Sequence, residues 1–113
     1  MQFNRKILPA EERLLDFLVK KSSILFPTNW KDKLLVRPMH DGKMGSLVLF
    51  PYGIIKSERL FGKQISECQF KDKDGIYVVA SLNIDKEGDL FELDIWKVDF
   101  SPLIDIPDCL FLK

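Results

Sequence analysis

The sequence predicts an α+β domain in which one N-terminal helix packs on a mainly antiparallel sheet of about five strands. Two observations point to this fold. An amphipathic helical pattern lies near the N-terminus, and residues 64–98 form three strand-like runs separated by two glycine-containing turns. At 113 residues the chain is long enough for one hydrophobic core and too short for two, so we expect residues 1–113 to form a single domain.

The predicted helix begins at Pro9, because proline is tolerated in the first helical turn and the acidic Glu11 and Glu12 favour the positive end of the helix dipole. A broad apolar stripe follows, with charged residues on the opposite side; it comprises Leu14, Leu15, Phe17, Leu18 and Val19. A helix of this length is unstable alone, so we expect it to pack on the apolar face of the sheet.

Two short strands are predicted next, at residues 34–37 and 46–50, joined by a glycine-containing connection. Residues 51–63 contain a proline and two glycines, which favour a long irregular connection.

Two turns set the predicted register of the 64–98 meander. Residues 73–75 fit a three-residue hairpin loop with Gly75 in the left-handed conformation, and residues 85–88 fit a four-residue loop ending in Gly88. The apolar face then contains the opposed pairs Cys68–Ala80, Phe70–Val78, Val78–Ile95, Ala80–Leu93 and Leu82–Phe91. A shift by one residue would bury Glu67 and Gln69, which desolvation opposes.

The other face of this sheet is the predicted functional surface. It collects Glu67, Gln69, Tyr77, Val79, Ser81, Glu92, Asp94 and Trp96. Tyr77 and Trp96 are expected to be cross-strand neighbours, either as a stabilising aromatic pair or as a binding anchor. We predict that the partner-binding residues are Glu67, Gln69, Tyr77, Glu92, Asp94 and Trp96.

The net charge of zero hides an asymmetry between the two parts of the chain. Residues 1–63 carry 12 Lys and Arg against 6 Asp and Glu, a net charge of +6, whereas residues 64–113 carry 5 against 11, a net charge of −6. A carboxylate-rich sheet is a poor surface for nucleic acid and suits a basic protein partner.

The N-terminal residues have no long apolar run, which argues against a secretory signal and a membrane span. Cys68 and Cys109 are too few for a disulfide framework, so we expect a reduced, cytoplasmic protein.

Three constellations could carry chemistry instead. The loop at residues 41–46 (DGKMGS) has the glycines and lysine of a phosphate loop but not its spacing, and a hairpin connection is preferred. His40 and Asp41 could form a hydrolytic site with Ser46 or Cys68, although the predicted register turns Cys68 into the core. Three acids, Glu67, Glu92 and Asp94, could bind a divalent cation or act as acid and base, with Glu67 and Glu92 on either side of Ser81.

The last of these constellations is the basis for an enzyme alternative, but solvated sheet carboxylates are the preferred interpretation. One histidine and two distant cysteines disfavour zinc. We therefore expect no metal and no cofactor.

Three motifs carry a resemblance to a known family: DGKMGSL at 41–47, FGKQISE at 61–67 and FELDIWKVDFSPL at 91–103. Together they resemble a family of small uncharacterised bacterial domains, over most of the chain. The resemblance implies no assigned activity and no catalytic residues. In single-domain size and bacterial distribution the family is similar to immunity proteins, which neutralise contact-dependent or other polymorphic toxins.

From these observations we expect an immunity protein of a toxin–antitoxin or contact-dependent growth inhibition system. It would bind a basic toxin domain through the acidic, aromatic sheet face and occlude its active site. The alternative is a small metal-dependent hydrolase or nuclease that uses the sheet carboxylates. A third possibility is a structural subunit that pairs with itself.

Overall fold

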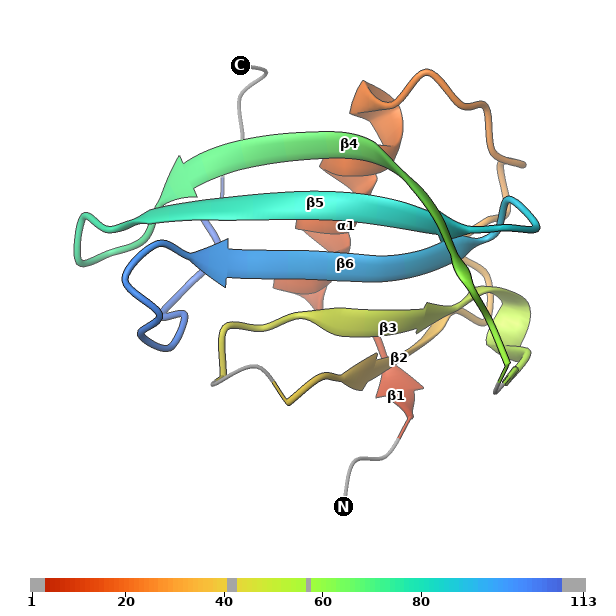
Figure 1. Cartoon of the computed structure of the whole chain (residues 1–113), viewed down its shortest axis with the longest axis horizontal. Helices are drawn as coiled ribbons and strands as arrows, with labels where there is room; N and C mark the ends of the chain where they lie inside the picture. Colours follow the sequence, from red (N-terminus) through yellow and green to blue (C-terminus); the bar gives the residue numbers. More distant parts are fainter. Residues whose placement is uncertain (1–3, 41–42, 57, 109–113) are drawn as a thin grey trace.

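Six strands form one antiparallel sheet in the order β1-β2-β3-β6-β5-β4, and helix α1 (Pro9–Lys21) packs on one face of it (Figure 1). The computed structural model describes residues 4–40, 43–56 and 58–108. The strands are β1 (Arg5–Lys6), β2 (Leu35–Pro38), β3 (Leu47–Phe50), β4 (Phe61–Lys71), β5 (Tyr77–Asp85) and β6 (Leu90–Lys97), with the short 3-10 helix η1 (Pro51–Gly53) after β3. The predicted α+β architecture is confirmed, with six strands rather than about five.

Helix α1 begins at Pro9 as the sequence predicts. The Leu8 backbone N–H donates to Glu11 Oε1 at 2.9 Å, which satisfies one donor at the start of the helix. The apolar stripe faces the sheet, where Leu14, Leu15 and Leu18 are completely buried. The helix is therefore stabilised by packing on the sheet rather than by its own length.

Strand β1 accounts for the additional strand. Arg5 pairs with Val36 and Lys6 pairs with Leu35 of β2, while the Arg5 guanidinium holds the Glu11 carboxylate through two contacts of 2.9 Å. A strand of two charged residues has no hydrophobic alternation, so the sequence pattern could not reveal it.

The β4–β5 hairpin has the predicted three-residue loop. The β5–β6 hairpin has a three-residue loop of the same kind rather than the predicted four-residue loop. In the β4–β5 turn, Gly75 N–H donates to Asp72 O and Asp72 N–H donates to Ile76 O, each at 2.9 Å. In the β5–β6 turn, Gly88 N–H donates to Asp85 O at 3.0 Å and Asp85 N–H donates to Asp89 O at 2.9 Å. Both glycines have positive φ, +81° and +89°.

The predicted register of β5 against β6 is therefore wrong by two residues. The shorter loop shifts the register by one residue. A bulge at Phe91 shifts it by one more residue, because Asn83 pairs with Glu92 while Ile84 pairs with Leu90. The observed partners are Val78–Lys97, Ala80–Ile95 and Leu82–Leu93, whereas the β4–β5 pairs Cys68–Ala80 and Phe70–Val78 are confirmed. Because the two shifts add to an even number, the predicted division into two faces survives.

The bulge removes one residue from the predicted core. Phe91 was expected opposite Leu82, but it is only half-buried, and the Arg59 guanidinium carbon lies 4.6 Å from its ring centroid. Phe50 of β3 is buried by the same side chain and by Arg37, whose guanidinium carbon lies 5.0 Å from the Phe50 centroid. Arg59 therefore lies over two phenylalanine rings that are outside the main core cluster.

Strand β4 starts earlier than expected, at Phe61, so the predicted long connection at 51–63 is wrong in its last three residues. The first part of β4 curves across one end of the sheet in Figure 1, with register shifts on either side of Lys63. Gly62 permits this curvature, because a Cβ there would lie 2.4 Å from the Asp85 carbonyl oxygen.

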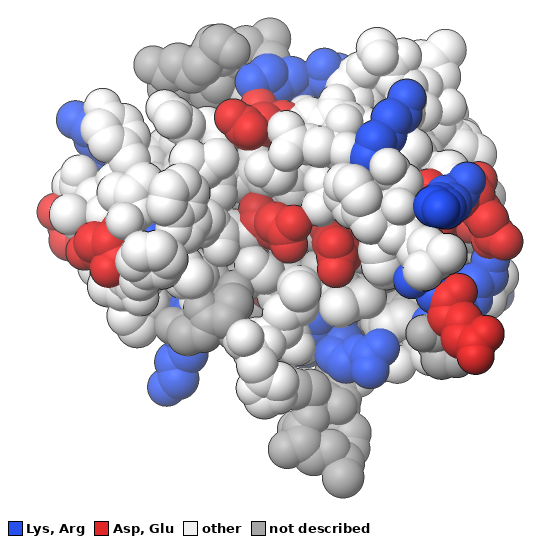
Figure 2. All heavy atoms as spheres, viewed as in Figure 1, with Lys and Arg blue, Asp and Glu red and all other residues white. Residues whose placement is uncertain are grey.

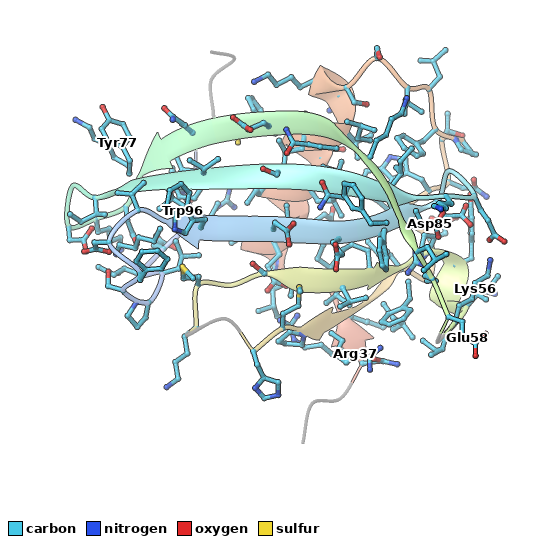
Figure 3. The ribbon with its side chains drawn as sticks, viewed as in Figure 1. Arg37, Lys56, Glu58, Tyr77, Asp85 and Trp96 are labelled. Carbon is cyan, nitrogen blue, oxygen red and sulfur yellow. The ribbon has the colours of Figure 1, made fainter. Side chains whose placement is uncertain are left out.

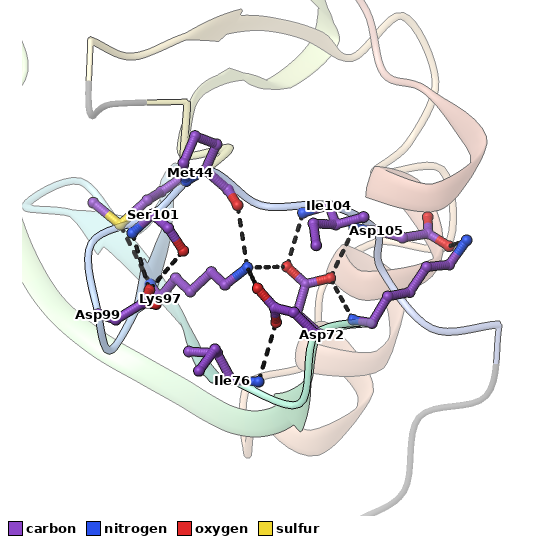
Figure 4. Close-up of polar contacts among 11 residues, drawn as sticks. Met44, Asp72, Ile76, Lys97, Asp99, Ser101, Ile104 and Asp105 are labelled. Carbon is purple, nitrogen blue, oxygen red and sulfur yellow. Dashed lines mark hydrogen bonds and ion pairs between the residues drawn. The ribbon is translucent and has the colours of Figure 1, made fainter.

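A buried ion cluster ties the β4–β5 turn to the segment after β6 (Figure 4). The completely buried Lys97 Nζ lies 2.8 Å from Asp72 Oδ2 and 2.7 Å from Asp74 Oδ2, and it also donates to the Pro102 carbonyl at 3.2 Å. Burial alone would raise the pKa of Asp72, but Lys97 and three backbone N–H groups outweigh it and lower the pKa to about 2.

Two of the motifs that carry the family resemblance meet beside this cluster. Leu103 N–H donates to the Lys43 carbonyl at 3.1 Å, and a Cβ added at Gly45 would lie 3.2 Å from the Leu103 side chain. These motif residues thus hold loop 43–46 against the segment that follows β6. Within the described ranges, no helix is long and apolar enough to cross a membrane.

Candidate functional site: the acidic sheet face

The sheet face that points away from α1 carries the predicted site residues. We call it the acidic face and define it as Glu67, Gln69, Tyr77, Ser81, Asn83, Glu92, Asp94 and Trp96. Cross-strand pairing aligns most of these residues, together with Val79 and Gln64, in three rows: Glu67–Ser81–Asp94 in the middle, Gln69–Val79–Trp96 on one side and Gln64–Asn83–Glu92 on the other. All six residues predicted to bind a partner therefore lie on one face, and Figure 2 shows acidic side chains near its middle.

An aromatic surface forms one end of the acidic face (Figure 3). Trp96 is 46% exposed, Tyr77 is 48% exposed and Phe100 is 69% exposed. The Trp96 and Phe100 rings are tilted, with centroids 6.1 Å apart, and Lys71 Nζ lies 5.3 Å from the Tyr77 centroid. Large aromatic side chains left this exposed are typical of binding surfaces.

The predicted direct pairing of Tyr77 with Trp96 is wrong. Trp96 lies opposite Val79, and Tyr77 lies opposite Lys71 on its other side. The two-residue change of register moves Trp96 along the sheet, so that its ring contact is with Phe100 instead.

Two carboxylates lie next to each other in the middle of the face. Glu92 and Asp94 are alternate residues of β6, and Asn83 Nδ2 donates to Asp94 Oδ2 at 2.8 Å. Burial, together with the negative charge of Asp94, raises the pKa of Glu92 above its ordinary value, although hydrogen bonding from Asn83 and the charge of Arg59 oppose this. The folded protein therefore holds Glu92 in an environment that disfavours its charged form.

The predicted arrangement of acids about Ser81 also needs correction. Ser81 lies between Glu67 and Asp94, and Glu92 lies opposite Asn83. Glu67 and Asp94 are thus two strand spacings apart, about 10 Å at the backbone. The adjacent pair of carboxylates is Glu92 with Asp94.

The other end of the face is closed by Arg59. Its Nε donates to Asp85 Oδ2 at 2.9 Å, and its two terminal nitrogens donate to the carbonyls of Leu49 and Leu90. This guanidinium joins β3, β5 and β6 to the segment before β4, and it is only 6% exposed. Arg59 is therefore a structural residue with its charge neutralised by Asp85.

A separate acidic cluster lies beside Arg59. Carboxylate oxygens of Asp85, Glu87 and Asp89 lie within 4.8 Å of one another. Asp85 Oδ1 accepts the N–H groups of Glu87 and Asp89, which builds the turn, and Lys56 Nζ lies 2.9 Å from Glu87. The turn geometry and two nearby cationic side chains, Lys56 and Arg59, explain why these carboxylates lie close together.

Three residues of the hydrolytic constellation predicted around His40 lie in the described part of the chain, and two of them, Ser46 and Cys68, are buried. His40 is exposed, whereas Ser46 is buried, its Oγ accepting Ile95 N–H at 2.8 Å and donating to Ile95 O at 3.2 Å. Cys68 faces the core as predicted, and burial raises the pKa of its thiol. Asp41 lies outside the described residues.

Strands β2 and β3 pair antiparallel, as the preferred hairpin connection requires, and Met39 N–H donates to Ser46 O at 2.9 Å; residues 41 and 42 of loop 41–46 lie outside the described residues. The apolar tail at 109–112, including Cys109, also lies outside the described residues.

Three further residues shape the face and were not predicted. Asn83 continues the strand alternation 77, 79, 81 and could have been found from it. Phe100 follows β6 and reaches Trp96 through a turn with φ +65°, which no sequence pattern indicated. Arg59 lies in an irregular connection, so its contacts depend on tertiary structure alone.

The family comparison covers nearly all of this architecture. Residues 4–107 match the family model described as Domain of unknown function (DUF6984), and the chain belongs to that family. No curated protein and no solved structure matches the chain.

Proposed function

We propose that this DUF6984 domain is an immunity protein that binds a basic toxin domain on the acidic face and occludes the toxin's active site. The observation that carries the proposal is the placement of three carboxylates beside exposed aromatic rings on one side of the sheet. In such a surface the aromatic residues anchor the complex, and the charged residues direct its formation.

Glu92 supports a binding role for these carboxylates. A group whose pKa is raised by burial and by a like charge destabilises the fold when it is ionised, so Glu92 is not explained by stability. A cationic side chain of a partner would reverse this effect, because an opposite charge favours the ionised form. Binding should then release a proton from those protein molecules in which Glu92 is protonated.

The binding test is surface plasmon resonance with a toxin-like domain whose gene lies directly upstream of this one, if the genome carries such a gene. Trp96→Ala should speed dissociation and weaken affinity by about 2 kcal/mol or more. Glu92→Gln should mainly slow association, and added salt should shrink the difference from wild type. Leu25→Ala is the matched control, because Leu25 is 98% exposed and lies outside the acidic face.

Two results would refute the proposal. One is that the wild-type protein does not bind the toxin domain or protect cells that express it. The other is that Trp96→Ala and Glu92→Gln bind like wild type while a helix substitution such as Lys20→Glu weakens binding, which would place the interface elsewhere.

A metal-dependent hydrolase or nuclease is the second candidate, favoured by the adjacent Glu92 and Asp94 and by the raised pKa of Glu92. It predicts that magnesium, manganese or calcium raises the melting temperature in a saturable way, by mass action on the folded state. We expect no such shift. A saturable shift that Glu92→Gln abolishes would favour the enzyme over the immunity protein.

A further inference from the structure

Strand β4 is at an edge of the sheet, and its outer side offers a template for another strand. Across the described parts of the chain, β5 is the only strand paired with β4. The register shifts of β4 lie between Phe61 and Ser66, so the stretch from Ser66 to Lys71 pairs regularly with β5. An edge of this kind is a ready site for strand addition.

The backbone groups on the free side of β4 belong to alternate residues. The β4–β5 turn begins with Asp72 N–H donating to Ile76 O, and antiparallel pairs alternate between hydrogen-bonded and non-bonded. Phe70 and Cys68 are therefore bonded to β5, and the backbone groups of Glu67, Gln69 and Lys71 point outward. The contact from Lys21 Nζ to the Glu67 carbonyl agrees with this assignment.

We propose that β4 pairs with β4 of a second copy of this chain, in antiparallel register about a two-fold axis at Gln69. In this register Gln69 faces Gln69, and Glu67 of each copy faces Lys71 of the other. The outward backbone groups of all three residues would then be paired. The two Glu–Lys cross-strand pairs add charge complementarity, since opposite charges facing each other stabilise a sheet.

The alternative self-pairings are less favourable. A two-fold axis at Glu67 opposes two glutamates and places Lys63 against Lys71, and an axis at Lys71 opposes two lysines. An axis at Cys68 pairs Glu67 with Gln69 and leaves Lys71 facing Ile65. The charge pattern therefore selects the Gln69-centred register.

The proposed dimer goes beyond the binding function and is compatible with it. A two-fold axis between antiparallel strands of one sheet is perpendicular to that sheet, so both acidic faces would lie on the same side. Trp96 and Tyr77 are on β6 and β5, away from the shared edge, and would stay exposed. The exposed Lys21 ammonium would have to leave the Glu67 carbonyl, and lysines are a common guard of sheet edges.

Analytical ultracentrifugation over about 1 µM to 1 mM protein tests this proposal. The wild-type mass should rise with concentration from 13.2 kDa toward twice that value. Glu67→Lys and Lys71→Glu should each weaken the dimer by about tenfold or more, and the double variant Glu67→Lys/Lys71→Glu should restore it. Lys63→Glu is the control, because Lys63 is exposed on β4 but lies outside the paired stretch.

The dimer is refuted if the wild type stays monomeric over this range, or if the double variant dimerises no better than the single ones. Circular dichroism would show that each variant is folded, which we expect because both side chains are exposed. The Trp96→Ala binding result is independent of this outcome, so failure of the dimer and failure of the proposed function are distinguishable.

Discussion

Replacing Asp72 by asparagine should lower the free energy of unfolding by about 3–5 kcal/mol, the range for breaking a buried ion pair. The Asp72 carboxylate accepts four hydrogen bonds: Oδ1 from the N–H groups of Lys73 and Asp105, and Oδ2 from Ile104 N–H and Lys97 Nζ, at 2.8 to 3.0 Å. An amide keeps one acceptor oxygen, so in either orientation two donors face an NH2 group. Lys97 also loses one of its two counter-charges.

Asp74→Asn is the matched control, because Asp74 contacts the same lysine at 2.7 Å but its side chain is 37% exposed. Water can replace part of that contact, so we expect a loss below about 1 kcal/mol. Urea unfolding followed by tryptophan fluorescence measures both variants, with an unchanged m-value showing that the unfolding transition is comparable. Equal losses from the two variants would refute the central role of Asp72.

The same cluster predicts a pH dependence. The folded-state pKa of Asp72 is about 2, below the value of about 3.9 for an unfolded aspartate. Its stabilisation is therefore present above about pH 4 and is lost as the pH falls through about 2. The difference between wild type and Asp72→Asn should be largest near neutral pH and should narrow in urea titrations at pH 3 and below.

Four more substitutions test the sheet. Leu93→Ala should cost about 2–5 kcal/mol in urea unfolding, because Leu93 is completely buried, whereas Ser81→Ala on the acidic face should change little. Gly62→Ala should cost about 1–3 kcal/mol by the same assay, since its Cβ would meet the Asp85 carbonyl at 2.4 Å. Glu92→Gln should raise the melting temperature at pH 7, and the gain should shrink in acid as wild-type Glu92 takes up its proton. Similar losses at Leu93 and Ser81, no loss at Gly62, or a lower melting temperature for Glu92→Gln would contradict these assignments.

The two hairpins show how far the sequence predicts this fold. Both loops follow one pattern, an aspartate whose carbonyl accepts the N–H of a glycine three residues later, but the sequence predicts the correct length only for the β4–β5 loop. No sequence pattern indicates the bulge at Phe91, and the Arg59 side chain that lies over the Phe91 ring and binds Asp85 reaches them through tertiary contacts alone. Alternation nevertheless assigned Glu92, Asp94 and Trp96 to one face, since the combined error was even.

The residues that sequence patterns missed are held by tertiary contacts. Arg59 reaches the carbonyls of two strands from an irregular segment, and β1 is recognised only by its pairing with β2. Strand alternation places Lys97 on the side opposite Asp94, but its burial between Asp72 and Asp74 depends on a turn and a strand far apart in the sequence. The alternation of side chains along a strand predicts which face of the sheet a residue lies on, but it does not predict its tertiary contacts on that face.

The two sides of strand β6 serve different purposes: one side contributes to the core, and the other carries residues of the proposed binding surface. Its inward residues Leu93, Ile95 and Lys97 are buried in the core or in the ion cluster, whereas Glu92 and Trp96 alternate with them on the acidic face. Changes on the inward side should therefore lower stability, and changes on the outward side should leave it unchanged or, at Glu92, raise it. The Glu92 carboxylate, whose charge opposes folding on a strand otherwise built for stability, therefore supports the proposed binding role.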